Sequence, residues 1–237
     1  MSTIAITFDV PPYRLSGVVY GALLNHAPQL AALGEAMNQA PYKAAPRAPV
    51  LAVKPRNTLA ADGDAVQVPA GVEALEIGAS LGIVIARTAC RVAADAAFDY
   101  IAGYTIVNDL SVPMPDHQPA HYRPAVRFKA RDGFCPIGPR VVPAAQLPSP
   151  DALAVQVMVD GRLVQAGSTG ERVRGVAQLL ADVTAFMTLQ AGDLLMLGVA
   201  GGAPRALAGQ AVAITIDGLG TLHNRLVAES QAAGASA

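Results

Sequence analysis

Basic side chains gather in two short parts of the sequence, and their chemistry suits the binding of an organic acid. Two follow the apolar residues 50–53, and four lie in the stretch 111–139, which contains six prolines; they are Lys54 and Arg56, and Arg123, Arg127, Lys129 and Arg131. Arginine holds a carboxylate through two parallel hydrogen bonds, and lysine supplies a compact positive charge. The pattern predicts a cationic wall for an acidic ligand. Solvated surface charge, or a charged lid that binds nothing, remains the alternative.

A second set of residues could transfer protons beside such a wall. Asp109 follows an expected strand over residues 104–107 and is the one buried-looking acidic residue in the middle of the chain. Together with Lys129 and His26 it makes the candidate set for general acid–base catalysis. His26 comes directly after an expected buried strand, residues 18–24, so a structural histidine satisfied in a core or loop is the alternative for that residue.

Other catalytic motifs do not occur in the sequence. There is no phosphate-binding loop that ends in Gly-Lys-Ser/Thr, no strand–GxGxxG–helix unit and no Gly-x-Ser-x-Gly elbow. The glycine-rich segment 198–202 lacks a following helix and is typical of a turn. Two cysteines, Cys90 and Cys135, are too few for a disulfide framework or a cysteine-based zinc site.

The elements that position these residues are expected to be mainly strands. From Leu75 to Ile85 apolar residues occupy the odd positions, and polar or very small residues occupy the even positions from 76 to 82, which predicts one strand with one packed and one open face. Asp160-Gly161 predicts a tight hairpin turn. Ser168 and Glu171 have the spacing of a capping box, which predicts a helix start there. The fold class is therefore α+β and β-rich, with three helices.

Composition and charge limit the function classes. The 237 residues have 17 Lys+Arg against 18 Asp+Glu, 52% hydrophobic and 15% charged residues, which predicts a globular protein. Without a basic block or a long apolar run, we expect no nucleic-acid partner, no membrane span and no secretory leader, and hence a cytoplasmic protein. Residues 1–16 are expected to form an N-terminal extension, residues 17–229 a single domain and residues 230–237 a flexible tail.

Several segments in the sequence form an ordered series: Leu24-Asn25-His26, Lys54-Pro55-Arg56-Asn57, residues 100–104 with Asn108-Asp109, residues 129–139, residues 186–193 and residues 224–227. Taken together and in this order, they resemble the fumarylacetoacetate hydrolase family. The resemblance implies a fold of mixed β-sheets, or β-roll, with a few peripheral helices, and a dimeric arrangement of such domains. Residues 39–44 and 131–136 are most similar to the branch of the family that degrades 4-hydroxyphenylacetate (homoprotocatechuate).

The resemblance also implies a divalent cation, Mg²⁺ or Mn²⁺, held by a Glu-x-Glu pair and an aspartate. Hard cations prefer carboxylate oxygens, and the metal takes up the charge of an enolate. Asp109 matches the aspartate, but Gly78 and Ser80 replace the two glutamates. The family's lid histidine falls on Gln29, and its Gly-Thr-Pro reads Gly198-Val199-Ala200. We therefore assign no metal ligands and no cofactor from the sequence.

Two hypotheses follow from the resemblance. In the first, the chain is a decarboxylase/isomerase subunit acting on 5-oxopent-3-ene-1,2,5-tricarboxylate or 2-hydroxyhepta-2,4-diene-1,7-dioate, with Lys129 matching the family's active-site lysine. In the second, it keeps the fold but supports a metal-binding partner half. A stand-alone metal-dependent hydrolase or decarboxylase is the third alternative. The expected partners are a small keto- or hydroxy-acid and either a second copy or a C-terminal-type homologous subunit.

Overall fold

The computed structural model describes residues 18–40, 43–113 and 126–229. The predicted extension and tail, and with them Arg123, lie outside these residues. The described strands are β1 (Val19–Leu23), β2 (Val50–Lys54), β3 (Leu59–Ala61), β4 (Ala65–Val68), β5 (Ala74–Glu76), β6 (Ala79–Ile85), β7 (Ile101–Asn108), β8 (Cys135–Pro143), β9 (Ala154–Val159), β10 (Arg162–Ser168), β11 (Leu194–Met196), β12 (Arg205–Leu207), β13 (Ala211–Ile216) and β14 (Gly220–Ala228).

These strands form three sheets. The largest has seven strands in the order β2-β1-β11-β6-β7-β8-β3, the second has the order β10-β9-β13-β14-β4, and β12 pairs with β5. Most neighbours are antiparallel, whereas β1 with β11, β3 with β8 and β14 with β4 are parallel. The mixed pairing confirms the predicted β-rich fold.

The main core lies between the two larger sheets. Ile83 and Ile106 of the seven-stranded sheet belong to one apolar cluster with Val157 and Ile214 of the five-stranded sheet. A second, smaller cluster, which includes Val84 and Val107, covers the other face of the seven-stranded sheet. Because alternate residues of a strand point to opposite faces, β6 and β7 are buried on both sides.

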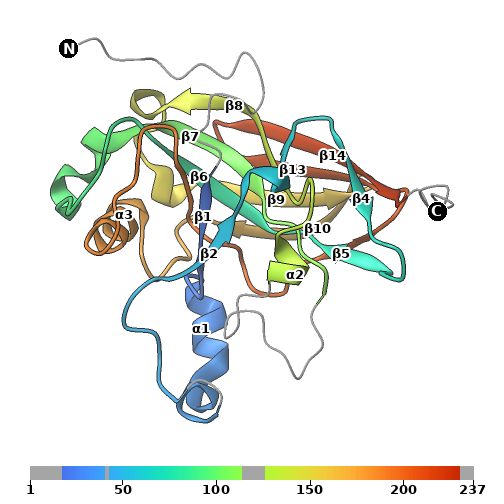
Figure 1. Ribbon diagram of the computed structural model, residues 1–237, viewed down its shortest axis with the longest axis horizontal. Coiled ribbons are helices and arrows are strands. Elements are labelled where there is room, and N and C mark those ends of the chain that lie inside the picture. Colours follow the sequence, from blue (N-terminus) through green and yellow to red (C-terminus); the bar gives the residue numbers. More distant parts are fainter. Residues whose placement is uncertain (1–17, 41–42, 114–125, 230–237) are drawn as a thin grey trace, which may run out of the picture.

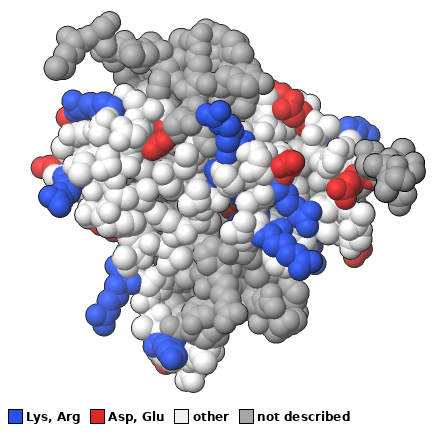
Figure 2. All heavy atoms as spheres, in the orientation of Figure 1, with Lys and Arg blue, Asp and Glu red and all other residues white. Residues whose placement is uncertain are grey.

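In the described part of the chain, three α-helices and several short 3₁₀ helices lie at the periphery (Figure 1). The helices are α1 (Ala27–Leu33), α2 (Val126–Lys129) and α3 (Val176–Thr184), and the 3₁₀ turns are η1 (Gly34–Asn38), η2 (Arg56–Thr58), η3 (Ala94–Tyr100), η4 (Ala144–Gln146) and η5 (Pro150–Ala152). None of the described helices has the length and hydropathy to cross a membrane. On the face in Figure 2, acidic and basic side chains are scattered over a mostly uncharged surface.

Two local predictions were wrong. Residues 75–85 do not form one strand with an open face, because the chain breaks between β5 and β6 and every residue of β6 is buried. The Ser168–Glu171 pair forms a hydrogen-bonded turn instead of a helix start. Helix α3 begins later, where the Asp151 carboxylate accepts a hydrogen bond from the Val176 N–H. The predicted hairpin at Asp160-Gly161 is confirmed, because this turn joins β9 to β10.

Candidate functional site

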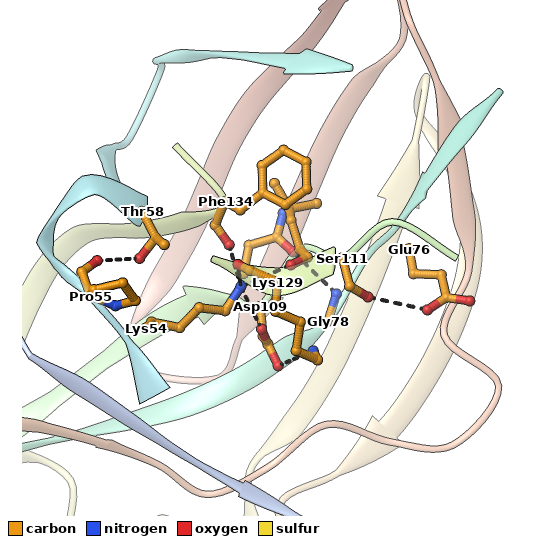
Figure 3. Close-up of polar contacts among 11 residues, drawn as sticks. Lys54, Pro55, Thr58, Glu76, Gly78, Asp109, Ser111, Lys129 and Phe134 are labelled. Carbon is orange, nitrogen blue, oxygen red and sulfur yellow. Dashed lines mark hydrogen bonds and ion pairs between the residues drawn. The ribbon is translucent and has the colours of Figure 1, made fainter. Parts of the chain in front are cut away.

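Asp109 is the centre of a buried charge cluster at the end of β7. Its N–H donates to the Gly78 carbonyl, which holds the residue beside the start of β6. Lys54 Nζ lies 2.8 Å from Asp109 Oδ1, and Lys129 Nζ donates to Oδ2 at 2.7 Å. The carboxylate side chain is only 3% exposed. Figure 3 shows the two ammonium groups converging on this one carboxylate.

The two lysines keep Asp109 ionised. Burial by itself would raise the pKa of this carboxyl group, but the charges of Lys129 and Lys54 outweigh it and lower the pKa to about 2. Since the folded-state pKa is below the unfolded value of 3.8, this carboxylate stabilises the fold above pH 3.8. That stabilisation is lost as the pH falls through 2.

Lys54, which ends β2, is wholly buried, with 0% exposure. Its ammonium forms an ion pair with Asp109 and donates hydrogen bonds to the carbonyl oxygens of Leu110 at 2.8 Å, Lys129 at 2.9 Å and Phe134 at 2.8 Å. Burial lowers the pKa of Lys54, and the adjacent carboxylate opposes this. Every donor of the ammonium group is thus used within the protein. Lys54 thus holds the Asp109 carboxylate and the segment 129–134 in position.

Lys129 instead faces a pocket of about 130 Å³. Its lining has an apolar part and a polar part, which we call the apolar wall and the polar wall. The apolar wall comes from the end of β1 and the loop after β11, and consists of Ala22, Leu23, Leu24 and Val199. The polar wall consists of Glu76, Asp109, Ser111 and Lys129, with Gln29 of α1 also present. Such a pocket suits a small ligand that carries both an anionic group and a hydrocarbon chain.

The other predicted binding residues lie elsewhere. Arg56 is exposed in the η2 turn, and Arg131 Nε donates to the Arg127 carbonyl within its own turn. Neither lines the pocket. Among the described residues, the predicted cationic wall is therefore reduced at the pocket to Lys129, because Lys54 is enclosed behind Asp109.

His26 is the N-cap of α1 and joins this helix to the glycine-rich loop. Its Nδ1 accepts hydrogen bonds from the N–H groups of Gln29 and Gly201, both at 3.2 Å. Its Nε2 lies 3.7 Å from the Glu171 carboxylate. The ring is not part of the pocket lining, whereas Gln29 and Val199, on either side of this link, are. The geometry gives His26 a positioning role.

Protonation of His26 is expected to weaken the fold at acidic pH. Burial, and then the nearby Arg172, lower its pKa below 6.5, with Glu171 opposing. The unfolded chain therefore takes up a proton first, so the free energy of unfolding should fall as the pH drops below 6.5. His26→Asn keeps an N-cap acceptor but cannot titrate. Urea unfolding at pH 7.5 and pH 5 should show a smaller pH dependence for this variant than for wild type. His223→Asn, at an exposed histidine, is the control, and equal slopes for all three proteins would contradict the assignment.

The residues present do not fit the metal of the family. A Cβ added at Gly78 would lie 2.5 Å from the Asp109 carbonyl oxygen and 2.9 Å from a Val199 methyl, so no glutamate fits there without a backbone shift. Ser80 is buried, and its hydroxyl accepts from the Gly198 N–H. Both oxygens of Asp109 face lysine ammoniums. Among the described residues, no three His, Cys, Asp or Glu side chains form a metal-binding group.

Glu76 and Ser111 also line the pocket, and neither was predicted from the sequence to be a site residue. The two residues form an isolated antiparallel bridge, and the Ser111 hydroxyl donates to Glu76 Oε2 at 3.2 Å. The only available signal was that Glu76 shares a strand face with Gly78. Ser111 had none, because it comes near Glu76 only through the pairing of segments 35 residues apart.

The chain is similar to several known proteins. The family model described as the C-terminal domain of fumarylacetoacetate (FAA) hydrolase matches residues 18–227. The 4-hydroxyphenylacetate degradation bifunctional isomerase/decarboxylase of Escherichia coli is 36% identical over 217 residues, which cover 92% of this chain and 48% of that protein. The chain thus spans about half the length of the first curated relatives it matches.

Two solved structures are similar over most of the chain. 5-Carboxymethyl-2-hydroxymuconate delta-isomerase from Mycobacterium smegmatis has a TM-score of 0.77 and 29% identity, covering 92% of this chain and 81% of its own. 2-Hydroxyhepta-2,4-diene-1,7-dioate isomerase from Mycobacterium marinum has a TM-score of 0.74 and 30% identity, covering 92% and 77%.

Proposed function

Because the chain belongs to the fumarylacetoacetate hydrolase family, we propose that it is a subunit of an isomerase/decarboxylase of 4-hydroxyphenylacetate degradation. Its substrate is 2-hydroxyhepta-2,4-diene-1,7-dioate or the precursor 5-oxopent-3-ene-1,2,5-tricarboxylate. The names of one sequence relative and one structural neighbour support this substrate class. The observation that carries the proposal is the pocket in which Lys129 faces an apolar wall.

The pocket can bind a substrate of this class in a defined orientation. A carboxylate or enolate oxygen pairs with the ammonium of Lys129, and the carbon chain packs against Leu23, Leu24 and Val199. Asp109 holds Lys129 by a hydrogen bond of 2.7 Å, and Lys54 in turn holds Asp109. The ammonium therefore does not reorient when negative charge develops on the substrate, which is the condition for electrostatic stabilisation of a transition state.

The chemistry proposed here uses an ammonium group where other family members use a metal. In the isomerisation, the enol O–H proton leaves, the electron pairs of the diene shift along the chain and a proton is added at C5. A dienolate is the intermediate between the two proton transfers. Its oxygen lies beside the Lys129 ammonium, which stabilises the charge and donates a hydrogen bond.

A spectroscopic assay tests this function. The purified chain should convert the conjugated 2-hydroxydienoate to the 2-oxo-3-enoate, followed by the change in ultraviolet absorbance. Because Gly78 and the two lysines leave no donor set for a divalent ion, we expect chelation by EDTA to change kcat by less than about twofold. Loss of turnover with EDTA and recovery with Mn²⁺ would overturn the metal-free assignment, and no turnover would overturn the proposed activity.

A second candidate function is favoured by the same misfit with a metal. In this role the chain acts as a non-catalytic half that supports a homologous, metal-binding subunit. The enzymatic proposal accommodates either a second copy or this homologous subunit. Under the supporting role, Asp109→Asn leaves the turnover of the complex intact, whereas under the enzymatic role it lowers turnover because Lys129 loses its fixed position.

A further inference from the structure

Two described carboxylates, Asp109 and Glu76, line the pocket. They differ in how closely each is paired with a cation, and this pairing decides how readily a carboxylate accepts a proton. Asp109 is 3% exposed and lies between two ammonium groups, one on each oxygen. With a pKa of about 2 it is a weak proton acceptor at neutral pH. A group that takes a proton from the substrate and returns it must be sought on the rest of the polar wall.

Glu76 is the other carboxylate of that wall. It ends β5, and its side chain is 30% exposed. Oε2 accepts from the Ser111 hydroxyl at 3.2 Å, and Oε1 lies 3.6 Å from Arg205, whose side chain is 62% exposed. Neither contact has the close, buried cation that fixes Asp109. Glu76 thus keeps an oxygen that can accept a proton from a ligand in the pocket.

Main-chain pairing fixes where this carboxylate lies. The Glu76 N–H donates to the Ser111 carbonyl at 2.8 Å, and the Ser111 N–H donates to the Glu76 carbonyl at 3.2 Å. Ser111 follows Asp109 by two residues, so the same short segment positions both carboxylates. Figure 3 shows Glu76 hydrogen-bonded to Ser111, to one side of the cluster of Asp109 and Lys129. Glu76 and Lys129 both line the pocket that would hold the ligand.

We propose that Glu76 is the catalytic residue that carries the proton in the isomerisation, an inference that rests on the proposed function. The Glu76 carboxylate takes the proton of the 2-hydroxyl group as the O–H bond breaks. The electron pair forms the 2-oxo group, the two double bonds become one between C3 and C4, and the protonated Glu76 gives its proton to C5. The carboxylate is regenerated, and substrate and product have the same atoms.

The test compares Glu76→Gln with Glu73→Gln in the dienol assay. Gln keeps an oxygen that accepts from Ser111 but cannot carry a proton, whereas Glu73 is exposed on the same segment. We expect Glu76→Gln to lower kcat by about 10²-fold or more, as removal of a general acid–base does. The dissociation constant for heptanedioate, a saturated diacid used as the probe, should change by less than about threefold. Glu73→Gln should match wild type in both, and Glu76→Asp should recover part of kcat.

The outcomes separate this inference from the proposed function. If wild type converts the dienol and Glu76→Gln does so at a similar rate, Glu76 is not the proton carrier while the function stands. If Glu76→Gln loses heptanedioate binding as strongly as turnover, Glu76 acts in binding and the inference is wrong. If wild type itself converts nothing, both the proposed function and the inference fail. Thermal unfolding of each variant confirms that it is folded.

Discussion

Replacing Lys54 by Met should lower the free energy of unfolding by about 3 kcal/mol or more, the range seen when one partner of a buried ion pair is removed. The change removes one hydrogen bond from each of three carbonyl oxygens, and it leaves Asp109 with Lys129 as its one remaining counter-charge in the cluster. For a chain of this size, such a loss corresponds to a fall in Tm of roughly 6 to 12 °C. Chemical and thermal unfolding at pH 7 measure both quantities.

Arg56→Met is the matched control for this experiment. Arg56 follows Lys54 by two residues in the same basic motif, but its side chain is exposed. Surface changes of this kind usually alter stability by less than about 0.5 kcal/mol. If Lys54→Met were as stable as Arg56→Met, the buried ammonium would not hold the 129–134 segment and Asp109 in place.

Replacing Lys129 by Met should lower kcat for the dienol by about 10²- to 10³-fold, the usual effect of removing one donor that stabilises an oxyanion. The Lys129 ammonium is the described cation that lines the pocket, while Lys54 remains enclosed with Asp109. Binding of the substrate carboxylate should weaken as well, because Met offers neither charge nor donor. Steady-state kinetics of the complete enzyme, with any partner subunit present, measure kcat and KM.

Arg127→Met serves as its control, because Arg127 is an exposed cation on the same short helix, α2. It removes one positive charge near the pocket without removing the ammonium that lines it, and we expect kcat to stay within about twofold. If Lys129→Met kept its activity, the reaction would not take place in this pocket. That result would favour the supporting role for this chain.

Lys54 and Lys129 have the same side chain, and the sequence predicts that both belong to a cationic wall that binds an acidic ligand. Lys54 became an internal counter-ion because Leu110, Lys129 and Phe134, which are 56, 75 and 80 residues away, bring their carbonyl oxygens around its Nζ. No pattern near residue 54 reveals these partners. Likewise, the alternation over residues 75–85 indicated strand but not the break after Glu76, which depends on pairing with Ser111 and Arg205.

Properties set by neighbouring residues could be predicted from the sequence: the Asp160-Gly161 hairpin, the abundance of strands, the ordered family motifs and the loss of the two glutamates at Gly78 and Ser80. Steric preference and side-chain periodicity act over a few residues, so they can be recognised in the sequence. The tertiary structure alone decided which charges are buried, which carboxylate lacks a close, buried cation and which residues share a pocket. Those properties arise from contacts between distant segments, whose burial and electrostatic fields exist only once the sheets have paired.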